Sequence, residues 1–122
     1  MTKITIICPT YNSSNFVEET IESIVKQDEV IDEIIFSDDG SNDDTLTTIE
    51  NFMSKYNEIN YRLIKNTHKG PGAARNKAIK HANYDWIDFI DSDDIWKKNK
   101  ISTMKKYIDQ NNYYNFFVTT RC

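Results

Sequence analysis

The sequence is poor in cysteine, has no long apolar run and carries no excess of positive charge. Only two cysteines, Cys8 and Cys122, occur in 122 residues, which excludes a disulfide framework or a metal knuckle and leaves free thiols in a reducing compartment. No stretch approaches the ~20 apolar residues of a membrane span, and the N-terminal apolar run is too short for a signal peptide. The formal net charge of −4 disfavours nucleic acid as the main partner. We therefore expect a cytoplasmic protein.

Internal repeats and low-complexity linkers are missing as well. Their absence excludes a solenoid or a chain of linked modules. A length of 122 residues fits one domain, large enough to bury a core without help from a metal or a disulfide. We treat residues 1–122 as one structural unit.

Strand-like and helix-like apolar patterns alternate along the chain. Strands are predicted at 3–8, 31–37, 59–65, 85–90 and 114–120, and helices at 16–25, 45–56, 73–82 and 98–110. Asn15, with Glu18 three residues later, is expected to cap the first helix, and Phe16 is expected on its apolar face. The alternation predicts an α/β fold with a mainly parallel sheet and helices on both faces.

Polar loops follow three of the predicted strands. The first strand is followed by "PTYN", the second by "DDGS" and the fourth by "DSDD", while a short helix is preceded by the Gly-containing "KGPGAARN". Sheets of this class bind ligands outside the carboxyl ends of their strands. We expect these loops to line one crevice.

Asp91 and Asp93 stand two residues apart at a predicted strand end. Extended geometry directs both carboxylates to the same side, and convergent oxygen ligands suit Mg²⁺ or Mn²⁺. The alternative is that they are solvated turn residues, and the short pattern taken alone favours it. Asp85 is interpreted as a solvated turn residue. For Asp88, in mid-strand, the sequence suggests only a lysine partner or a place near an exposed edge.

Three further candidates also have two interpretations each. Asp39 either accepts a hydrogen bond from a nucleotide or belongs to an ordinary turn before a helix capped by Ser41 or Asn42. Arg75 either approaches a phosphate or a base, or is simply solvated. His68 is interpreted as a solvated loop histidine, in preference to a catalytic base.

Four segments in order resemble the successive motifs of family 2 glycosyltransferases. They are "ITIICPTYNSSNFVEETIESIVKQ", "IIFSDDGSNDDT", "KGPGAARNKAI" and "WIDFIDSDD". The resemblance covers nearly the whole chain. It implies a GT-A fold, a Rossmann-like three-layer α/β/α arrangement, and transfer of a sugar from a nucleotide-sugar to an acceptor hydroxyl with inversion. It also implies bacterial polysaccharide or lipid-linked glycan synthesis, with peripheral association at the cytoplasmic face of the membrane.

The resemblance carries over to individual residues. The residues implied to contact the nucleotide-sugar, a UDP-sugar by expectation, are Pro9, Thr10, Tyr11, Asn12, Asp39, Arg75 and Ser92. The residues implied to hold Mg²⁺ or Mn²⁺ on the pyrophosphate are Asp91, Asp93 and Asp94. Within these sets, Asp39 would hydrogen-bond the base, commonly uracil, and neighbouring Asp38 would be a structural partner. Lys98 departs from the proline that the family often has after the acidic cluster, without touching the metal ligands.

The implied reaction is a single displacement in which the metal stabilises the leaving nucleoside diphosphate. A general base should deprotonate the acceptor, and in the family it lies in a later segment. We find no matching acid before Cys122, and Asp109 is not assigned this role. We therefore expect a fragment that holds the donor half, in preference to a naturally short protein that binds without turnover. Such a fragment should bind a uridine diphosphate nucleotide with a divalent ion but transfer sugar slowly or not at all.

Other nucleotide-binding and signalling classes fit less well. A receiver domain needs an acidic pair after the first strand and an aspartate after the third, where this chain has "PTYN" and "KNTHKG". A nicotinamide dehydrogenase needs G-x-G-x-x-G after the first strand, and a nucleotidyltransferase needs a Gly-rich basic loop there. A module that only binds a nucleotide-sugar remains the main rival to an enzyme.

Overall fold

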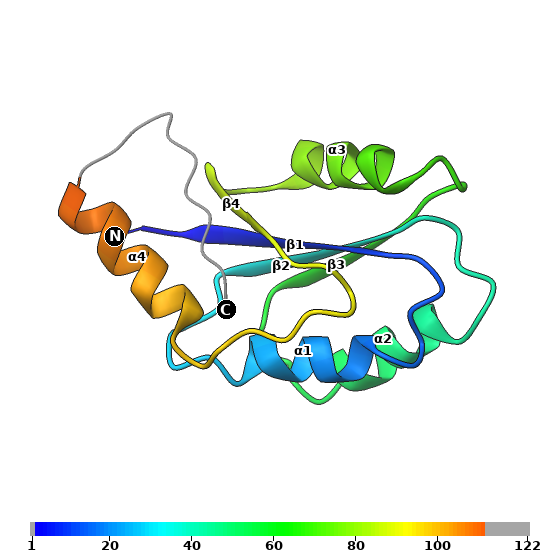
Figure 1. Cartoon of the computed structure of the whole chain (residues 1–122), viewed down its shortest axis with the longest axis horizontal. Helices are drawn as coiled ribbons and strands as arrows, with labels where there is room; N and C mark the ends of the chain where they lie inside the picture. Colours follow the sequence, from blue (N-terminus) through cyan, green and yellow to red (C-terminus); the bar gives the residue numbers. More distant parts are fainter. Residues whose placement is uncertain (1, 112–122) are drawn as a thin grey trace.

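The computed structural model describes residues 2–111, which form a four-stranded sheet flanked by helices (Figure 1). The strands are β1 (Ile4–Thr10), β2 (Glu33–Asp38), β3 (Tyr61–Lys65) and β4 (Trp86–Phe89). The helices are α1 (Val17–Val25), α2 (Thr45–Met53), α3 (Pro71–His81) and α4 (Lys100–Asn111). The predicted α/β class is confirmed. The strand predicted at 114–120 lies outside the described residues.

The strand order β3-β2-β1-β4 places β1 inside the sheet, and each neighbouring pair is parallel. The chain moves from β1 to β2 and β3, then returns to place β4 on the other side of β1. Right-handed crossovers that run in opposite directions leave their helices on opposite faces. Accordingly, α1 and α2 cover one face and α3 covers the other (Figure 1). The strand order reverses beside β1, which is where such sheets bind ligands.

Both faces of β1 are buried, which explains why this segment shows no apolar–polar alternation. Its successive residues point to opposite faces. Ile6 belongs to the larger core cluster, which α1, α2 and α4 complete, and Ile7 packs in a smaller cluster with Ile35 and Ala78 of α3. The sheet is therefore held from both sides, and its carboxyl edge is a firm base for the loops.

The start of α1 differs from the prediction. The helix begins at Val17, and Phe16 occupies the cap position with no side-chain capping hydrogen bond. The main-chain oxygen of Ser13 instead accepts the N–H groups of Phe16 and Val17, each at 2.9 Å, so the expected cap by Asn15 is wrong. Phe16 is 57% exposed because it precedes the helix and does not share its buried face.

Two ion pairs, one buried and one partly exposed, attach α4 to the rest of the domain. Lys100 Nζ lies 2.8 Å from Asp88 Oδ2 and 4.5 Å from the centroid of the Trp96 ring. Lys105 Nζ lies 2.8 Å from Asp32 Oδ2. Desolvation raises the pKa of Asp88, and the ammonium group of Lys100 opposes that rise. The suggested lysine partner for the mid-strand aspartate is thus confirmed.

Candidate functional site

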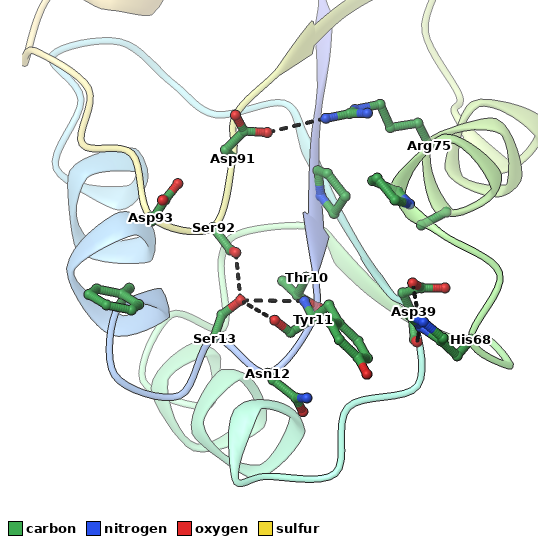
Figure 2. A pocket seen from close by; sticks show the side chains of 14 residues that line it. Thr10, Tyr11, Asn12, Ser13, Asp39, His68, Arg75, Asp91, Ser92 and Asp93 are labelled. Atoms are coloured by element: carbon green, nitrogen blue, oxygen red, sulfur yellow. Dashed lines mark hydrogen bonds and ion pairs between the residues drawn. The ribbon is translucent and has the colours of Figure 1, made fainter.

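A pocket of about 430 Å³ opens at the carboxyl edge of the sheet (Figure 2). Every residue predicted to contact the nucleotide-sugar lines it, as do Asp91 and Asp93. Asp94 is adjacent but does not line it. The pocket walls also include residues that were not predicted to belong to the site, namely Ser13, Phe16, His68, Pro71 and Ala74. Loops far apart in the sequence therefore meet here, as the parallel strand ends predict.

Asp38, at the end of β2, organises the turn that follows it. Its Oδ1 accepts hydrogen bonds from Thr10 Oγ1 at 2.7 Å and Ser41 Oγ at 2.6 Å. Its Oδ2 accepts the N–H groups of Gly40 at 3.1 Å and Ser41 at 2.8 Å. Gly40 has a φ of +85°, a conformation that costs other residues about 1–2 kcal/mol. Asp38 is buried and fully engaged, which confirms its predicted structural role.

Asn12 joins the loop after β1 to the loop after β2. Its N–H donates to Ser41 Oγ at 2.8 Å, and its Oδ1 accepts the N–H of Asn42 at 2.8 Å. The residue has a φ of 47°, and asparagine tolerates this left-handed region better than most side chains. The two bonds hold the loops together as one wall of the pocket.

Asp39 is buried and receives three hydrogen-bond donors. The N–H of Lys69 donates to Oδ1 at 2.8 Å, and the N–H of Gly70 lies 3.1 Å from both oxygens. His68 Nδ1 lies 2.8 Å from Oδ2. The Lys69 N–H contributes most to lowering the pKa of Asp39. Burial opposes this effect, whereas Gly70 and His68 lower the pKa further. Asp39 is therefore ionised at neutral pH.

His68 is 60% exposed, as expected of a solvated loop histidine, but it also lines the pocket, which was not predicted. Its ring stacks on Tyr11 with centroids 4.5 Å apart and an interplanar angle of 25°. Figure 2 places both rings beside Asp39 and away from Asp91 and Asp93. This position does not suit a base that works near the acidic cluster. The available signal was its place two residues before Gly70, in a loop already expected to line the crevice.

The acidic loop after β4 gathers three exposed carboxylates. Asp91, Asp93 and Asp94 each offer an oxygen, and these oxygens lie within 4.8 Å of one another. The N–H of Asp94 donates to the main-chain oxygen of Asp91 at 3.0 Å, which tightens the turn. Arg75 Nη2 donates to Asp91 Oδ1 at 3.3 Å (Figure 2). The loop thus concentrates negative charge at one end of the pocket.

The donor set of this cluster fits a hard divalent cation. All three candidate ligand groups are carboxylates, which Mg²⁺ and Mn²⁺ prefer. Exposed side chains leave coordination positions for water and for phosphate oxygens. A cation would also relieve the mutual repulsion of the three acids.

Ser92 fixes the acidic loop to the start of α1. Its Oγ lies 2.6 Å from Ser13 Oγ, and its main-chain oxygen accepts a hydrogen bond from Thr20 Oγ1 at 2.9 Å. Ser13 is buried, and its N–H donates to Thr45 Oγ1 at 2.8 Å. The loops after β1 and β4 are therefore connected, as are those after β1 and β2.

Comparison with known proteins identifies relatives. The model of the family described as Glycosyl transferase family 2 matches residues 5–122. An uncharacterized glycosyltransferase of Rickettsia felis is 41% identical over 112 residues, which cover 92% of this chain and 18% of the relative. The poly(ribitol-phosphate) beta-N-acetylglucosaminyltransferase TarS of Staphylococcus aureus is 35% identical over 90% of this chain and 19% of its own length. The chain thus spans about a fifth of the length of these relatives.

Solved structures show the same fold. A crystal structure of S. aureus TarS residues 1–349 in complex with UDP aligns with a TM-score of 0.82 and 32% identity, over 91% of this chain and 33% of that one. Glucosyl-3-phosphoglycerate synthase from Mycobacterium tuberculosis, in complex with Mn²⁺, UDP and glucosyl-3-phosphoglycerate, aligns with a TM-score of 0.61 and 25% identity, over 75% of this chain and 33% of that one. Among residues 2–111, no helix is long and apolar enough to span a membrane.

Proposed function

The chain belongs to glycosyl transferase family 2, and from this premise we propose that it is the donor-binding part of an enzyme that transfers a sugar from a UDP-sugar to an acceptor hydroxyl with inversion. One observation carries the proposal. A single pocket holds Asp39 near one end and Asp91 with Asp93 near the other (Figure 2). A ligand with a base at one end and a pyrophosphate at the other matches this distribution of groups.

The base belongs at the end formed by Tyr11 and Asp39. An aromatic ring offers a stacking surface for a planar base, and Tyr11 is 43% exposed. The ionised Asp39 carboxylate accepts an N–H from the base edge. This end of the pocket orients the nucleotide and selects its base.

The pyrophosphate belongs at the acidic end, with Mg²⁺ or Mn²⁺ held by Asp91 and Asp93 and by Asp94 as an alternative ligand. Bound there, the cation supplies Lewis-acid stabilisation of the leaving nucleoside diphosphate. Arg75 lies within 3.3 Å of Asp91 and contributes a second positive charge beside the phosphates. The acceptor attacks the anomeric carbon on the side opposite the leaving group. We assign the general base to no residue of 2–111.

The names of relatives support this assignment. TarS is a poly(ribitol-phosphate) beta-N-acetylglucosaminyltransferase and has been crystallised with UDP and with UDP-GlcNAc. A relative from Campylobacter jejuni, 36% identical, is a GalNAc(5)-diNAcBac-PP-undecaprenol beta-1,3-glucosyltransferase. We accordingly propose a role in bacterial cell-surface glycan synthesis.

Calorimetric titration tests the binding step. We expect UDP to bind this chain in the presence of Mn²⁺ or Mg²⁺, and to bind much more weakly after chelation with EDTA. Asp91→Asn and Asp93→Asn should reduce metal-dependent binding at least tenfold because each removes a charged oxygen ligand. Asp85→Asn is the matched control, since Asp85 is also exposed but precedes β4. Absence of metal-dependent binding by every nucleoside diphosphate would refute the proposal.

The rival function is nucleotide-sugar binding without turnover. Transfer of radiolabelled sugar from UDP-sugars should be measured with this chain and with any longer polypeptide that contains it. We expect the isolated chain to bind but to transfer very slowly, and the longer polypeptide to transfer. Binding by both without transfer by either would favour the binding module.

A further inference from the structure

We propose that the side chain of His68 occupies the position of the nucleotide base, so that a nucleotide binds fully only after His68 has turned away from Asp39 and Tyr11. The inference rests on the proposed function, because it concerns the base end of the same nucleotide site. It identifies His68 as an intramolecular competitor that lowers the affinity of the pocket for its nucleotide.

His68 makes the two contacts that a base needs at this end of the pocket. Its ring stacks on Tyr11 with centroids 4.5 Å apart and an interplanar angle of 25°. Its Nδ1 lies 2.8 Å from Asp39 Oδ2 and 3.2 Å from the main-chain oxygen of Asp39. Both oxygens are acceptors, so Nδ1 carries the hydrogen and donates it. A planar ring with an N–H group therefore already lies against Tyr11 and Asp39.

The carboxylate of Asp39 has no acceptor position left for a base. The N–H groups of Lys69 and Gly70 contact Oδ1 at 2.8 Å and 3.1 Å. The N–H of Gly70 and Nδ1 of His68 contact Oδ2 at 3.1 Å and 2.8 Å. An ionised carboxylate accepts about two hydrogen bonds at each oxygen. A base can therefore donate to Asp39 only if one of these three donors leaves.

His68 is the donor that can leave. The N–H groups of Lys69 and Gly70 belong to the main chain, which leads directly into α3. The other end of the loop is held by Asn66, whose Nδ2 donates to Ser37 Oγ at 2.9 Å. The His68 side chain, in contrast, is 60% exposed, so its imidazole exchanges Asp39 for water at a small net cost. The loop keeps these other contacts when the imidazole turns away.

Stacking on Tyr11 requires the same displacement. Because the imidazole contacts both Tyr11 and the carboxylate of Asp39, it covers the face of Tyr11 that lies toward Asp39 (Figure 2). A base that stacks on this face and also reaches Asp39 needs the volume that the imidazole fills. Aromatic rings stack with centroids about 4.5 Å or more apart, so no base fits between Tyr11 and His68 at their separation of 4.5 Å.

Calorimetry on the full chain in the presence of Mn²⁺ tests the competition. UDP should bind His68→Ala at least threefold more tightly than it binds the wild-type protein, because no side chain has to leave Asp39. Inorganic pyrophosphate should bind both proteins equally, because it engages only the acidic end of the pocket. His81→Ala is the matched control, because His81 contacts Arg62 outside the pocket, and should change neither affinity.

NMR of the imidazole groups follows the displacement in a protein that keeps His68. His68 and His81 are the only histidines of the chain, so His81→Ala assigns both sets of signals. The ring of Tyr11 shifts the signals of a stacked imidazole upfield. Saturation with UDP and Mg²⁺ should remove this shift from His68 and leave the His81 signals of the wild-type protein in place.

The outcomes separate this inference from the proposed function. Failure of both the wild-type protein and His68→Ala to bind UDP would overturn the proposed function, and this inference with it. Binding of UDP by His68→Ala with an affinity equal to or below that of the wild-type protein would overturn only the role of His68. His68 signals that UDP leaves in place or moves further upfield would also overturn that role, and an upfield movement would indicate that the imidazole stacks on the bound base.

Discussion

Replacement of Lys100 by methionine should destabilise the domain by leaving Asp88 buried without its partner. In the wild-type protein the charged atoms are 2.8 Å apart, and the side chains are 6% and 9% exposed. Methionine keeps an apolar stem beside Trp96 but removes the ammonium group. Breaking a buried pair in this way costs about 3–5 kcal/mol.

The loss should depend on pH, because Asp88 escapes the penalty by taking up a proton. Burial already raises its pKa above the ordinary 3.8, and Lys100 opposes that rise, so removal of Lys100 raises it further. A carboxyl that stays neutral when folded but ionises when unfolded costs about 1.4 kcal/mol for each pH unit above its unfolded pKa. The largest loss of folding stability from this effect is about 4 kcal/mol at pH 7 and about 2 kcal/mol at pH 5. Stability is therefore retained below about pH 4 and lost as the pH rises.

Urea unfolding followed by circular dichroism at pH 5 and pH 7 measures the loss of stability and its dependence on pH. Lys106→Met is the matched control, because Lys106 is an exposed lysine of the same helix, and should change stability by less than about 0.5 kcal/mol. Adding Asp88→Asn to Lys100→Met removes the titrating group and should abolish the pH dependence. A loss below about 1 kcal/mol at pH 7, or an equal loss at both pH values, would refute the reasoning.

Three further perturbations test local features. Gly40→Ala should destabilise the domain by about 1–2 kcal/mol, because the φ of Gly40 is +85° and the added Cβ would lie 3.1 Å from the backbone nitrogen of His68. Gly72→Ala is the control, because nothing lies within 4 Å of its added Cβ. Equal melting temperatures for the Gly40→Ala variant and the wild-type protein would contradict this prediction. Burial alone would raise the pKa of Asp43, but hydrogen bonds from Thr45 and Ser14 outweigh burial and lower this pKa from 3.8 to about 2. The contribution of ionised Asp43 to folding stability is therefore present above pH 4 and lost as the pH falls toward 2. Asp43→Asn should therefore be less stable than wild type at pH 7 but equal to it below pH 2. A stability difference between the two proteins that stays constant during acid unfolding would contradict this role of the Asp43 hydrogen bonds. Burial raises the pKa of the Cys8 thiol, so peptide mass spectrometry should find Cys8 alkylated only after unfolding; rapid labelling of the folded protein would show the thiol to be accessible.

The order of elements and the crowding of polar loops at one edge were predictable from local patterns. The buried strand β1 reads as a continuous apolar run, and turn residues directly follow β1, β2 and β4. Parallel strands place these turns at one edge, so the meeting of Asp39 with Asp91 in one pocket required no knowledge of side-chain contacts. That part of the site follows from topology.

Contacts between distant segments were not predictable in the same way. Asp88 is paired with Lys100 because the fold brings the first residue of α4 to the buried face of β4, and no sequence period specifies that distance. His68 and Asp39 are 29 residues apart, and only the folded loop brings the imidazole to the carboxylate. Asn15 satisfies the spacing of a helix cap, yet the main chain of Ser13 takes that place. Local rules fail where tertiary structure offers a competing partner.

The position of β1 between β2 and β4 sets a minimum length for any molecule that bridges the pocket. Neighbouring strands are about 4.8 Å apart, so the ends of β2 and β4 are separated by roughly 10 Å. A free nucleoside that reaches Asp39, or a free phosphate that reaches Asp91, engages one end alone. Compounds that carry a base and a phosphate at this separation can bind both ends of the pocket at once. The distance between these two groups should therefore be the first property chosen in an inhibitor for this pocket, ahead of its charge.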